Sequence, residues 1–234
     1  MPKISITIPA YEYHGHGTEI LEYSFKQMEI QTFTDFDIII SDHSIDNELK
    51  NLCSKWDNKL NIKYIRNEKD RGNPSANANN AILHSESEYI KFLCQDDYLL
   101  DENSLSIING ALDNNYNWLV TRYYYTHDRN NLINSYMPSM NNQIMIVNTI
   151  GSPSCAIFKR FNFDDMPKFD LNLLYCWDCE FYYSYIQKYG NPKIIENSTV
   201  VNYLWEESIT SSITQEVTNK ENAYILKKHN FIKE

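Results

Sequence analysis

Glycine is scarce in this sequence, with only six residues among 234. The glycines form no Walker A loop of the kind that cradles nucleotide phosphates. The nearest approach to a G-x-G-x-x-G fingerprint begins at Gly15 and Gly17, but Ile20 stands where the third glycine should be. A P-loop enzyme and a dinucleotide-dependent enzyme are therefore both disfavoured.

Long apolar runs are also missing, since no stretch approaches the ~20 apolar residues that a membrane-spanning helix needs. Residues 1–3 are followed directly by an alternating apolar run and lack the pattern of a signal peptide. The five cysteines are an odd number in a chain of ordinary size, which argues against a secreted disulfide framework. The sequence therefore predicts a cytoplasmic protein.

Basic residues are in the minority, with 21 Lys and Arg against 31 Asp and Glu, a formal net charge of −10. Sequence-independent binding to nucleic acid requires positive side chains that replace counterions along the phosphates, so we expect no nucleic-acid partner. The 42% of apolar residues and 14% of aromatic residues are too many for a disordered chain. They are enough to form one sizeable core.

Strand-like and helix-like spacing of apolar residues alternate along the first half of the chain. The predicted strands are 4–8, 36–40, 62–64 and 89–93. The predicted helices begin at a Thr18 cap, at Ile45, and at Asn73-Pro74, where a capping residue precedes a proline in the first turn. Such alternation is typical of βαβ units and a parallel sheet.

The second half of the chain has a less regular pattern. It predicts strands at 118–125, 154–158 and 200–205, a loop at 130–143, and a helix at 177–189 that ends at Gly190. The predicted fold class is α/β, with a mainly parallel sheet flanked by helices and a C-terminal part that closes over one side of the sheet.

Polar residues follow each of the first four predicted strands. Ligands of open parallel sheets bind at the carboxyl ends of the strands, so these residues are the first candidates for a site. Asp42 and Asp46 follow the second strand, where the plainer explanation is that they cap the next helix. Asp96 and Asp97 follow the fourth strand, and two adjacent carboxylates repel each other unless a cation or donors separate them. This pair favours a hard divalent cation such as Mg²⁺ or Mn²⁺.

The chain resembles the family-2 glycosyltransferases, which have the GT-A fold and use nucleotide sugars. Four segments carry the resemblance in the same order, at residues 5–11, 40–46, 72–82 and 92–97. The resemblance implies one GT-A domain over residues 1–234. It further implies a nucleotide-sugar-binding half at 1–115 and an acceptor-binding half at 116–234.

Individual site residues follow from the same resemblance. It implies that Pro9, Tyr11 and Asp42 line a uridine pocket and that Asn79 contributes to binding the nucleotide sugar. It also implies that Asp96 and Asp97 hold the divalent metal, Mn²⁺ or Mg²⁺, under the diphosphate, with Asp96 also contacting the donor.

The acceptor half offers one candidate catalytic base. The family commonly carries Glu-Asp at the start of a helix near the acceptor, and this chain has Trp177-Asp178. The resemblance therefore implies that Asp178 is the base. Glu180 is the reserve candidate, although two positions along a helix its side chain should point elsewhere. The segment 151–155 resembles the family's small-residue loop before the acceptor site.

The chain departs from the family pattern at several positions. Cys94 stands where a further aspartate is common, and Asn77-Ala78-Asn79 lacks a common arginine. Arg71 or Lys69 could replace that cation. The family's late histidine is absent, and the segment 205–208, which holds Glu206 and Glu207, occupies its place with an open role.

The predicted function is transfer of a sugar from a UDP-sugar to a hydroxyl of a carbohydrate or lipid-linked glycan acceptor, with inversion, in the synthesis of a bacterial surface polysaccharide. A peripheral contact with the inner face of the cell membrane stays open. Two alternatives remain, a nucleotidyltransferase and a non-catalytic nucleotide-binding or glycan-binding protein of the same fold.

Overall fold

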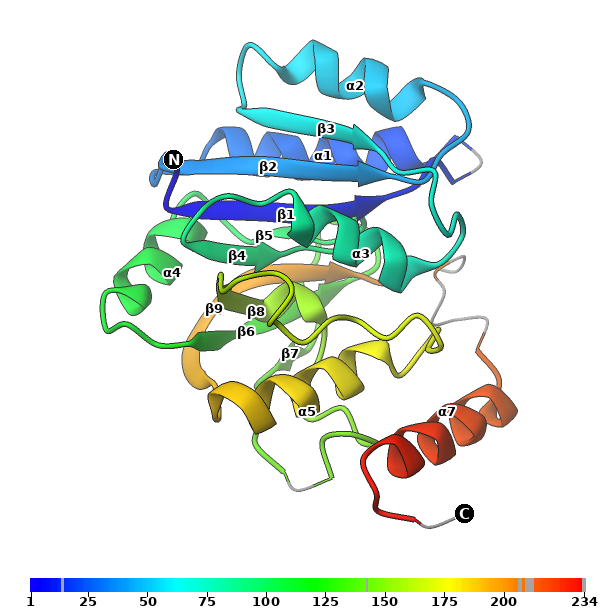
Figure 1. Ribbon diagram of the computed structural model, residues 1–234. Helices are drawn as coiled ribbons and strands as arrows, with labels where there is room; N and C mark the ends of the chain where they lie inside the picture. The colour runs from blue at the N-terminus through cyan, green and yellow to red at the C-terminus, as the bar shows by residue number, and fades with distance from the viewer. Residues whose placement is uncertain (14, 142, 206–207, 209–212, 233–234) are drawn as a thin grey trace.

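The computed structural model describes residues 1–13, 15–141, 143–205, 208 and 213–232. In these residues nine strands form one sheet in the order β3-β2-β1-β4-β8-β6-β9-β5, with β7 paired to β6 (Figure 1). The strands are β1 (Ile4–Ala10), β2 (Phe36–Asp42), β3 (Ile62–Arg66), β4 (Tyr89–Phe92), β5 (Tyr98–Leu99), β6 (Trp118–Thr126), β7 (Ser135–Tyr136), β8 (Ala156–Lys159) and β9 (Lys193–Tyr203). The helices are α1 (Gly17–Glu29), α2 (Glu48–Trp56), α3 (Pro74–Leu83), α4 (Ser104–Leu112), α5 (Trp177–Tyr189) and α7 (Gln215–Lys228), with a 3₁₀ turn η1 (Pro153–Cys155).

The predicted α/β fold with a parallel sheet in the first half of the chain is confirmed. β1 pairs in parallel with β2 and β4, and β2 pairs in parallel with β3. The second half adds antiparallel pairs that its periodicity did not indicate, because β8 runs antiparallel to both β4 and β6. The sheet is continuous from β3 to β5, and the division of the chain at residue 115 stays a prediction.

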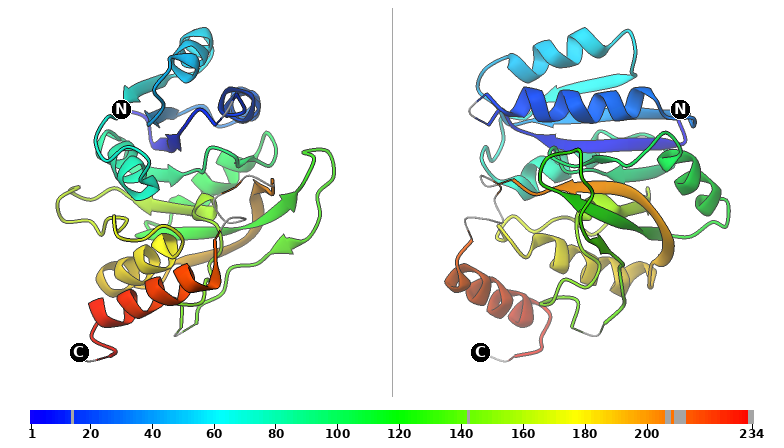
Figure 2. Two further views of the ribbon diagram at one scale, coloured as in Figure 1. Left: turned by 90° about the vertical axis from the view of Figure 1, so that its right-hand side faces the viewer. Right: turned by 180° about the vertical axis from the view of Figure 1, so that it is seen from behind.

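β1 lies near the centre of the sheet and is covered on both faces. Ile4, Ile6 and Ile8 are fully buried, and so are Ser5 and Thr7 on the opposite side of the strand. Helices α1 and α3 lie on opposite faces of this part of the sheet, as the views from the side and from behind show (Figure 2). Double coverage explains why a strand with only alternate apolar residues is buried throughout.

Two predicted helix starts are wrong in detail. Glu12, not Thr18, provides the acceptors at the start of α1, because its carboxylate accepts hydrogen bonds from Gly17 N (3.1 Å) and Thr18 N (2.9 Å). Ile45 lies before α2 and is 80% exposed, so its spacing from Leu49 was coincidental. The Asn73 cap is confirmed, since its side chain accepts from Ala76 N at 3.0 Å.

Both halves of the chain contain elements that the periodicity missed, and the predicted loop at 130–143 includes strand β7. Helix α4, strand β5 and the C-terminal helix α7 were not predicted, and β9 begins seven residues before residue 200. Gly190 ends α5 as predicted, with a φ of 82° that favours glycine. Helix α7 lies beside α5 and the segment that leads into it (Figure 1). Among the described residues, none of the helices has the length and apolar character needed to cross a bilayer.

Candidate active site

A pocket of about 550 Å³ opens at the edge of the sheet where the parallel strands end. Pro9 and Tyr11 at the end of β1, His43 after β2 and Asp96 after β4 contribute to its lining. Trp177 at the start of α5 closes it from the C-terminal half. The volume is in the usual range for small-molecule sites, and the position is that expected for open α/β sheets.

Three of the predicted donor-binding residues therefore line one pocket, namely Pro9, Tyr11 and Asp96. Tyr11 is held there through its backbone, because Tyr11 N donates to Gln95 Oε1 at 2.8 Å. Gln95 in turn donates from Nε2 to Gly17 O at 3.0 Å. The segment between β4 and the acidic pair thus connects the end of β1 with the start of α1.

Asp42 lies behind the described pocket lining and is fully buried. Its carboxylate accepts hydrogen bonds from Tyr64 Oη (2.6 Å) and Ser44 N (2.7 Å), and lies 3.5 Å from Arg66 Nη2. The neighbouring residue His43 lines the pocket instead, and burial lowers the pKa of its imidazole. Asp42 therefore supports the part of the pocket wall that His43 forms.

Asn79 points away from the pocket that the described residues form. Its amide pairs with the backbone of Phe169, donating to Phe169 O at 2.8 Å and accepting from Phe169 N at 2.9 Å. Asn77 lines the pocket, and its Nδ2 donates to Ala10 O at 3.0 Å. Residues two apart on a helix face different directions, so Asn79 joins α3 to the loop at Phe169 and the structure does not bring it to the pocket.

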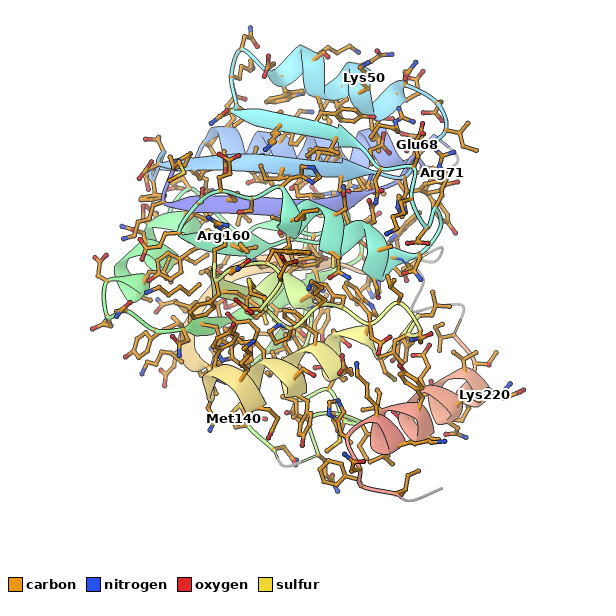
Figure 3. All side chains as sticks on the ribbon, in the orientation of Figure 1. Lys50, Glu68, Arg71, Met140, Arg160 and Lys220 are labelled. Carbon is orange, nitrogen blue, oxygen red and sulfur yellow. The ribbon has the colours of Figure 1, made fainter. Side chains whose placement is uncertain are left out.

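The proposed replacements for the missing arginine lie on an exposed loop. Lys69 and Arg71 are both exposed, and neither belongs to the described lining. Arg71 and Glu68 lie near the edge where β2 and β3 end (Figure 3). The loop turns through Asp70, whose φ is +52°, and its Lys69 carbonyl lies 3.2 Å from His43 Nε2. Arg71 is therefore near the pocket without lining it.

Cys94, Asp96 and Asp97 form a cluster at the end of β4, and their potential ligand atoms all lie within 4.8 Å of one another. Burial raises the pKa of Asp96, and burial together with the charge of Asp96 raises the pKa of Asp97 further. Carboxylates forced together in a buried place are relieved by a bound cation. The donor set therefore fits a divalent metal, with the Cys94 thiol in the place of the family's additional carboxylate.

Each aspartate of this pair is oriented by a different element. Asp97 Oδ1 accepts from Tyr203 N at 3.2 Å, at the end of β9. Asp97 Oδ2 accepts from Ser152 Oγ at 3.1 Å. Asp96 Oδ2 accepts from Trp205 Nε1 at 3.2 Å, so a tryptophan contacts the acidic pair in the region where the family has a histidine. Glu206 and Glu207 lie outside the described residues.

A lysine that sequence reasoning missed holds β4 to the loop of residues 151–155. Lys91 is fully buried, and its Nζ donates to Phe92 O at 2.8 Å and to Ser154 O. Burial lowers its pKa to about 8. Ser154 Oγ also accepts from Cys94 N at 2.8 Å. The signal was visible in the sequence, since a charged residue in the middle of a buried strand requires partners.

Gly151 is required at its position in this loop. Its φ of +93° favours glycine, and a Cβ there would clash with the Tyr123 hydroxyl. Tyr182 Oη donates to Gly151 O at 3.2 Å, which fixes the loop against α5. The close approach of the Tyr123 ring therefore explains why a small residue precedes Ser152.

Asp178 lies in the first turn of α5 and is linked to the same loop. Its Oδ2 accepts from Asn148 Nδ2 at 2.6 Å, and its Oδ1 accepts from Cys179 N at 2.7 Å. Asn148 also donates to Gly151 O (3.1 Å) and accepts from Gly151 N (2.6 Å). Burial raises the pKa of Asp178 to about 6. The loop thus connects the predicted base with Asp97 through Asn148 and Ser152.

Glu180 faces away from this loop, as its helical spacing indicated. Its side chain is fully buried, and its Oε1 lies 2.8 Å from Ser184 Oγ, 2.9 Å from Lys228 Nζ and 2.9 Å from His229 Nε2. These partners come from α5 itself and from the end of α7. Glu180 therefore joins the two C-terminal helices α5 and α7, and its carboxylate does not approach that of Asp178.

The mixed α/β sheet, the pocket at the strand ends and the acidic cluster after β4 define a GT-A glycosyltransferase fold. The family model for glycosyl transferase family 2 matches residues 5–166. The chain belongs to this family.

Two bacterial relatives illustrate the similarity. Over 103 residues the chain is 32% identical to the Campylobacter jejuni GalNAc(5)-diNAcBac-PP-undecaprenol beta-1,3-glucosyltransferase, covering 43% of this chain and 31% of the relative. Over 102 residues it is 30% identical to the Staphylococcus aureus poly(ribitol-phosphate) beta-N-acetylglucosaminyltransferase TarS, covering 44% of this chain and 18% of TarS. The matched segments thus span less than a third of the length of these two relatives.

Solved structures share the fold over nearly the whole chain. S. aureus TarS 1-349 in complex with UDP-GlcNAc superimposes with a TM-score of 0.74 at 20% identity, covering 96% of this chain and 66% of that one. The Pyrobaculum calidifontis mannosyltransferase PcManGT, in complex with GDP-Man and Mn²⁺, gives a TM-score of 0.66 at 12% identity, covering 100% of this chain and 65% of that one. At these low sequence identities the structural similarity establishes the fold alone.

Proposed function

We propose that this protein transfers a sugar from a UDP-sugar to a hydroxyl of a glycan acceptor, with inversion at the transferred carbon. One observation carries the proposal. Two acidic centres of different character, the Asp96–Asp97 pair and Asp178, are joined by one loop through Ser152 and Asn148. This arrangement offers a place for a charged diphosphate beside a group that can take a proton.

The first centre would hold the donor. Asp96 and Asp97, with Cys94 beside them, would hold a divalent cation, Mn²⁺ or Mg²⁺. When bound, such a cation neutralises the negative charge on the leaving diphosphate. Ser152 and the backbone of Tyr203 keep the Asp97 carboxylate in one orientation. Pro9, Tyr11 and His43 form the apolar and aromatic side of the same pocket, where the nucleoside would lie.

The second centre would activate the acceptor. A hydroxyl is a weak nucleophile at neutral pH, so an inverting transfer needs a carboxylate that accepts its proton as the new bond forms. The Asp178 carboxylate is held by Asn148 and by its own helix start, and its raised pKa makes it a stronger base than an exposed aspartate. The proton moves from the acceptor oxygen to Asp178 while the diphosphate leaves from the opposite side of the sugar.

The donor and acceptor classes are supported by the relatives. TarS has been solved with UDP-GlcNAc, while PcManGT holds GDP-Man and Mn²⁺, so both a uridine and a guanosine donor occur on this fold. The two curated relatives are named for a lipid diphosphate-linked glycan and for a poly(ribitol-phosphate) acceptor. We infer a UDP-sugar donor and a lipid-linked or polymeric glycan acceptor, used in bacterial surface polysaccharide synthesis at the inner face of the cell membrane.

Isothermal titration calorimetry with nucleoside diphosphates tests the donor. We expect UDP to bind more tightly than ADP or GDP, and to bind more tightly with Mn²⁺ than with EDTA, because the phosphates and the acidic pair would share the cation. Absence of UDP binding with Mn²⁺ present would contradict the proposal. Release of UDP from a UDP-sugar would then separate an enzyme from a non-catalytic binding protein.

The pH dependence of transfer tests the base. Asp178 works only when ionised, and its pKa of about 6 predicts that kcat falls about tenfold per pH unit below pH 6 and is level above it. A bound cation would favour the ionised form of Asp178, so it would move this acidic fall in kcat to lower pH and not to higher pH. A steady-state profile from pH 4.5 to 8 with saturating donor measures the limb. If Asp178→Asn, in protein that stays folded, keeps the same acidic fall in kcat as the parent, Asp178 is not the base.

A further inference from the structure

A buried carboxylate on the C-terminal helix receives three consecutive backbone N–H groups from another part of the chain. Glu221 Oε1 accepts from Leu174 N at 2.7 Å. Glu221 Oε2 accepts from Tyr175 N at 3.0 Å and from Cys176 N at 2.7 Å. Glu221 is only 8% exposed, so its charge is largely removed from water. Three donors on one carboxylate compensate for that loss of hydration.

These N–H groups belong to the three residues just before α5, which begins at Trp177. Cys176 is the N-cap residue of α5, and among the described residues its side chain makes no capping hydrogen bond. The first N–H groups of a helix have no partner within the helix, and a negative charge near them is favourable. Inside the helix Asp178 Oδ1 accepts from Cys179 N, so Glu221 serves the N–H of the N-cap residue Cys176 and the two N–H groups before it.

The segment held by Glu221 leads directly into the proposed site. Leu174 and Trp177 line the donor pocket, and Asp178 follows Trp177 in the first turn of α5. A shift of the segment would therefore move one wall of the pocket and the proposed base together. A misplacement of about 1 Å at a reacting group can cost about 10²-fold in rate.

We propose that Glu221 is a positioning residue for sugar transfer, which fixes the 174–176 segment so that Trp177 stays in the pocket lining and Asp178 stays at its contact with Asn148. The inference rests on the proposed function. Glu221 touches neither substrate nor metal in this scheme. It acts only through the backbone of the segment before α5.

Helix α7 has further attachments that do not depend on Glu221. Lys228 Nζ lies 2.6 Å from Asp170 Oδ2 and 2.9 Å from Glu180 Oε1. His229 contacts the same Glu180 carboxylate, and Ile225 is fully buried against the neighbouring apolar residues. A substitution at Glu221 should therefore leave α7 in place and loosen only the segment that the carboxylate holds.

The test is the kinetic behaviour of Glu221→Ala in the full chain. We expect kcat for transfer to fall by about 10²-fold, since Asp178 is no longer held in one position. The Kd of UDP with Mn²⁺, measured by calorimetry, should change far less than kcat, because the proposed nucleoside side of the pocket is Pro9, Tyr11 and His43, and because Ser152 and Tyr203 hold Asp97. A loss in kcat without a matching loss in UDP affinity is not what a general decrease in stability produces.

Two further variants sharpen the comparison. Glu221→Gln keeps the size of the side chain, but its amide NH₂ would face one of the three N–H groups, so we expect an intermediate kcat. Glu216→Ala removes a glutamate from the same helix, where it is exposed and pairs with Lys220 at 2.7 Å. We expect this control to retain the parent kcat.

The outcomes separate this inference from the proposed function. If the parent protein binds no UDP with Mn²⁺, the proposed function fails, whatever Glu221 does. If the parent protein binds UDP and transfers sugar, but folded Glu221→Ala transfers at the parent rate, the positioning role is overturned. If Glu221→Ala does not fold, Glu221→Gln decides, and an unchanged kcat with only a lower melting temperature would reduce Glu221 to a structural contact.

Discussion

Replacing Asp97 with asparagine is expected to abolish the effect of Mn²⁺ on UDP binding, with a loss of at least about 100-fold in metal affinity. Removing a residue that merely supports a metal ligand already costs 10–100-fold, so loss of a ligand itself should cost more. Asp96→Asn should weaken binding less, because the Asp96 carboxylate is shared with Trp205 Nε1. Calorimetric titration of Mn²⁺ and of UDP with Mn²⁺ measures both effects.

The same variant distinguishes a metal site from a structural turn. The pKa of Asp97 is raised by burial and by the charge of Asp96, so the ionised pair is unfavourable without a cation. A neutral asparagine should therefore leave the metal-free protein as stable as the parent. Asp46→Asn is the matched control, since Asp46 is exposed and caps the backbone of Glu48 at 3.1 Å. Parent-like Mn²⁺ binding by both Asp97→Asn and Asp96→Asn would show that the pair only shapes the turn.

Asp178→Asn is expected to lower sugar transfer by the roughly 10²–10⁴-fold that general-base catalysis supplies. Asparagine nearly preserves the size of the side chain, but it cannot accept the proton of the acceptor hydroxyl. UDP affinity with Mn²⁺ should change little, because the acidic pair after β4 is unaltered. The acidic limb of the pH profile near pH 6 should also disappear from the residual activity.

The stability of Asp178→Asn requires its own measurement. The Asp178 carboxylate accepts from Asn148 Nδ2 and Cys179 N, and an amide can satisfy only one of these donors in the present geometry. We expect a loss of about 1 kcal/mol in the free energy of unfolding, typical of one hydrogen bond. Rates are therefore compared per folded molecule.

Glu180→Gln should lose stability, because it weakens the contacts with Lys228 and His229, and should keep its transfer rate per folded molecule. If Glu180→Gln loses transfer while Asp178→Asn keeps it, the assignment of the base is wrong.

The local pattern of the sequence predicts most of the parallel part of the sheet and its helices. Short apolar runs, alternating in β1 and β3 and nearly continuous in β2 and β4, identify these strands, and Asn73-Pro74 identifies the start of α3, because such runs and capping depend on neighbouring residues only. The start of α1 shows where this fails. Thr18 has the chemistry of a cap, but Glu12 reaches the same N–H groups from the preceding loop.

Site residues could be predicted from the sequence only where the position of a residue in its motif also determines where its side chain points. Pro9 lies at the end of β1, Tyr11 and Asp96 come just after β1 and β4, and all three line the pocket. Asn79 matches the family by position, but the helix turns it toward Phe169 and presents Asn77 to the pocket. Motif matching assigns a residue to a helix and does not settle which face of that helix the pocket meets.

The sequence by itself determined the fold class, the family, and the presence of an acidic pair at a strand end, because these depend on short-range periodicity and contiguous motifs. Only the tertiary structure decided how the acidic groups are held. Asp178 meets Asn148 across 30 positions, and Glu221 meets Leu174 across 47. Such contacts arise when helices and loops pack on the sheet, and no spacing within either segment encodes the partner. Local motifs therefore determine which chemical groups the site contains, and tertiary packing determines how these groups are arranged.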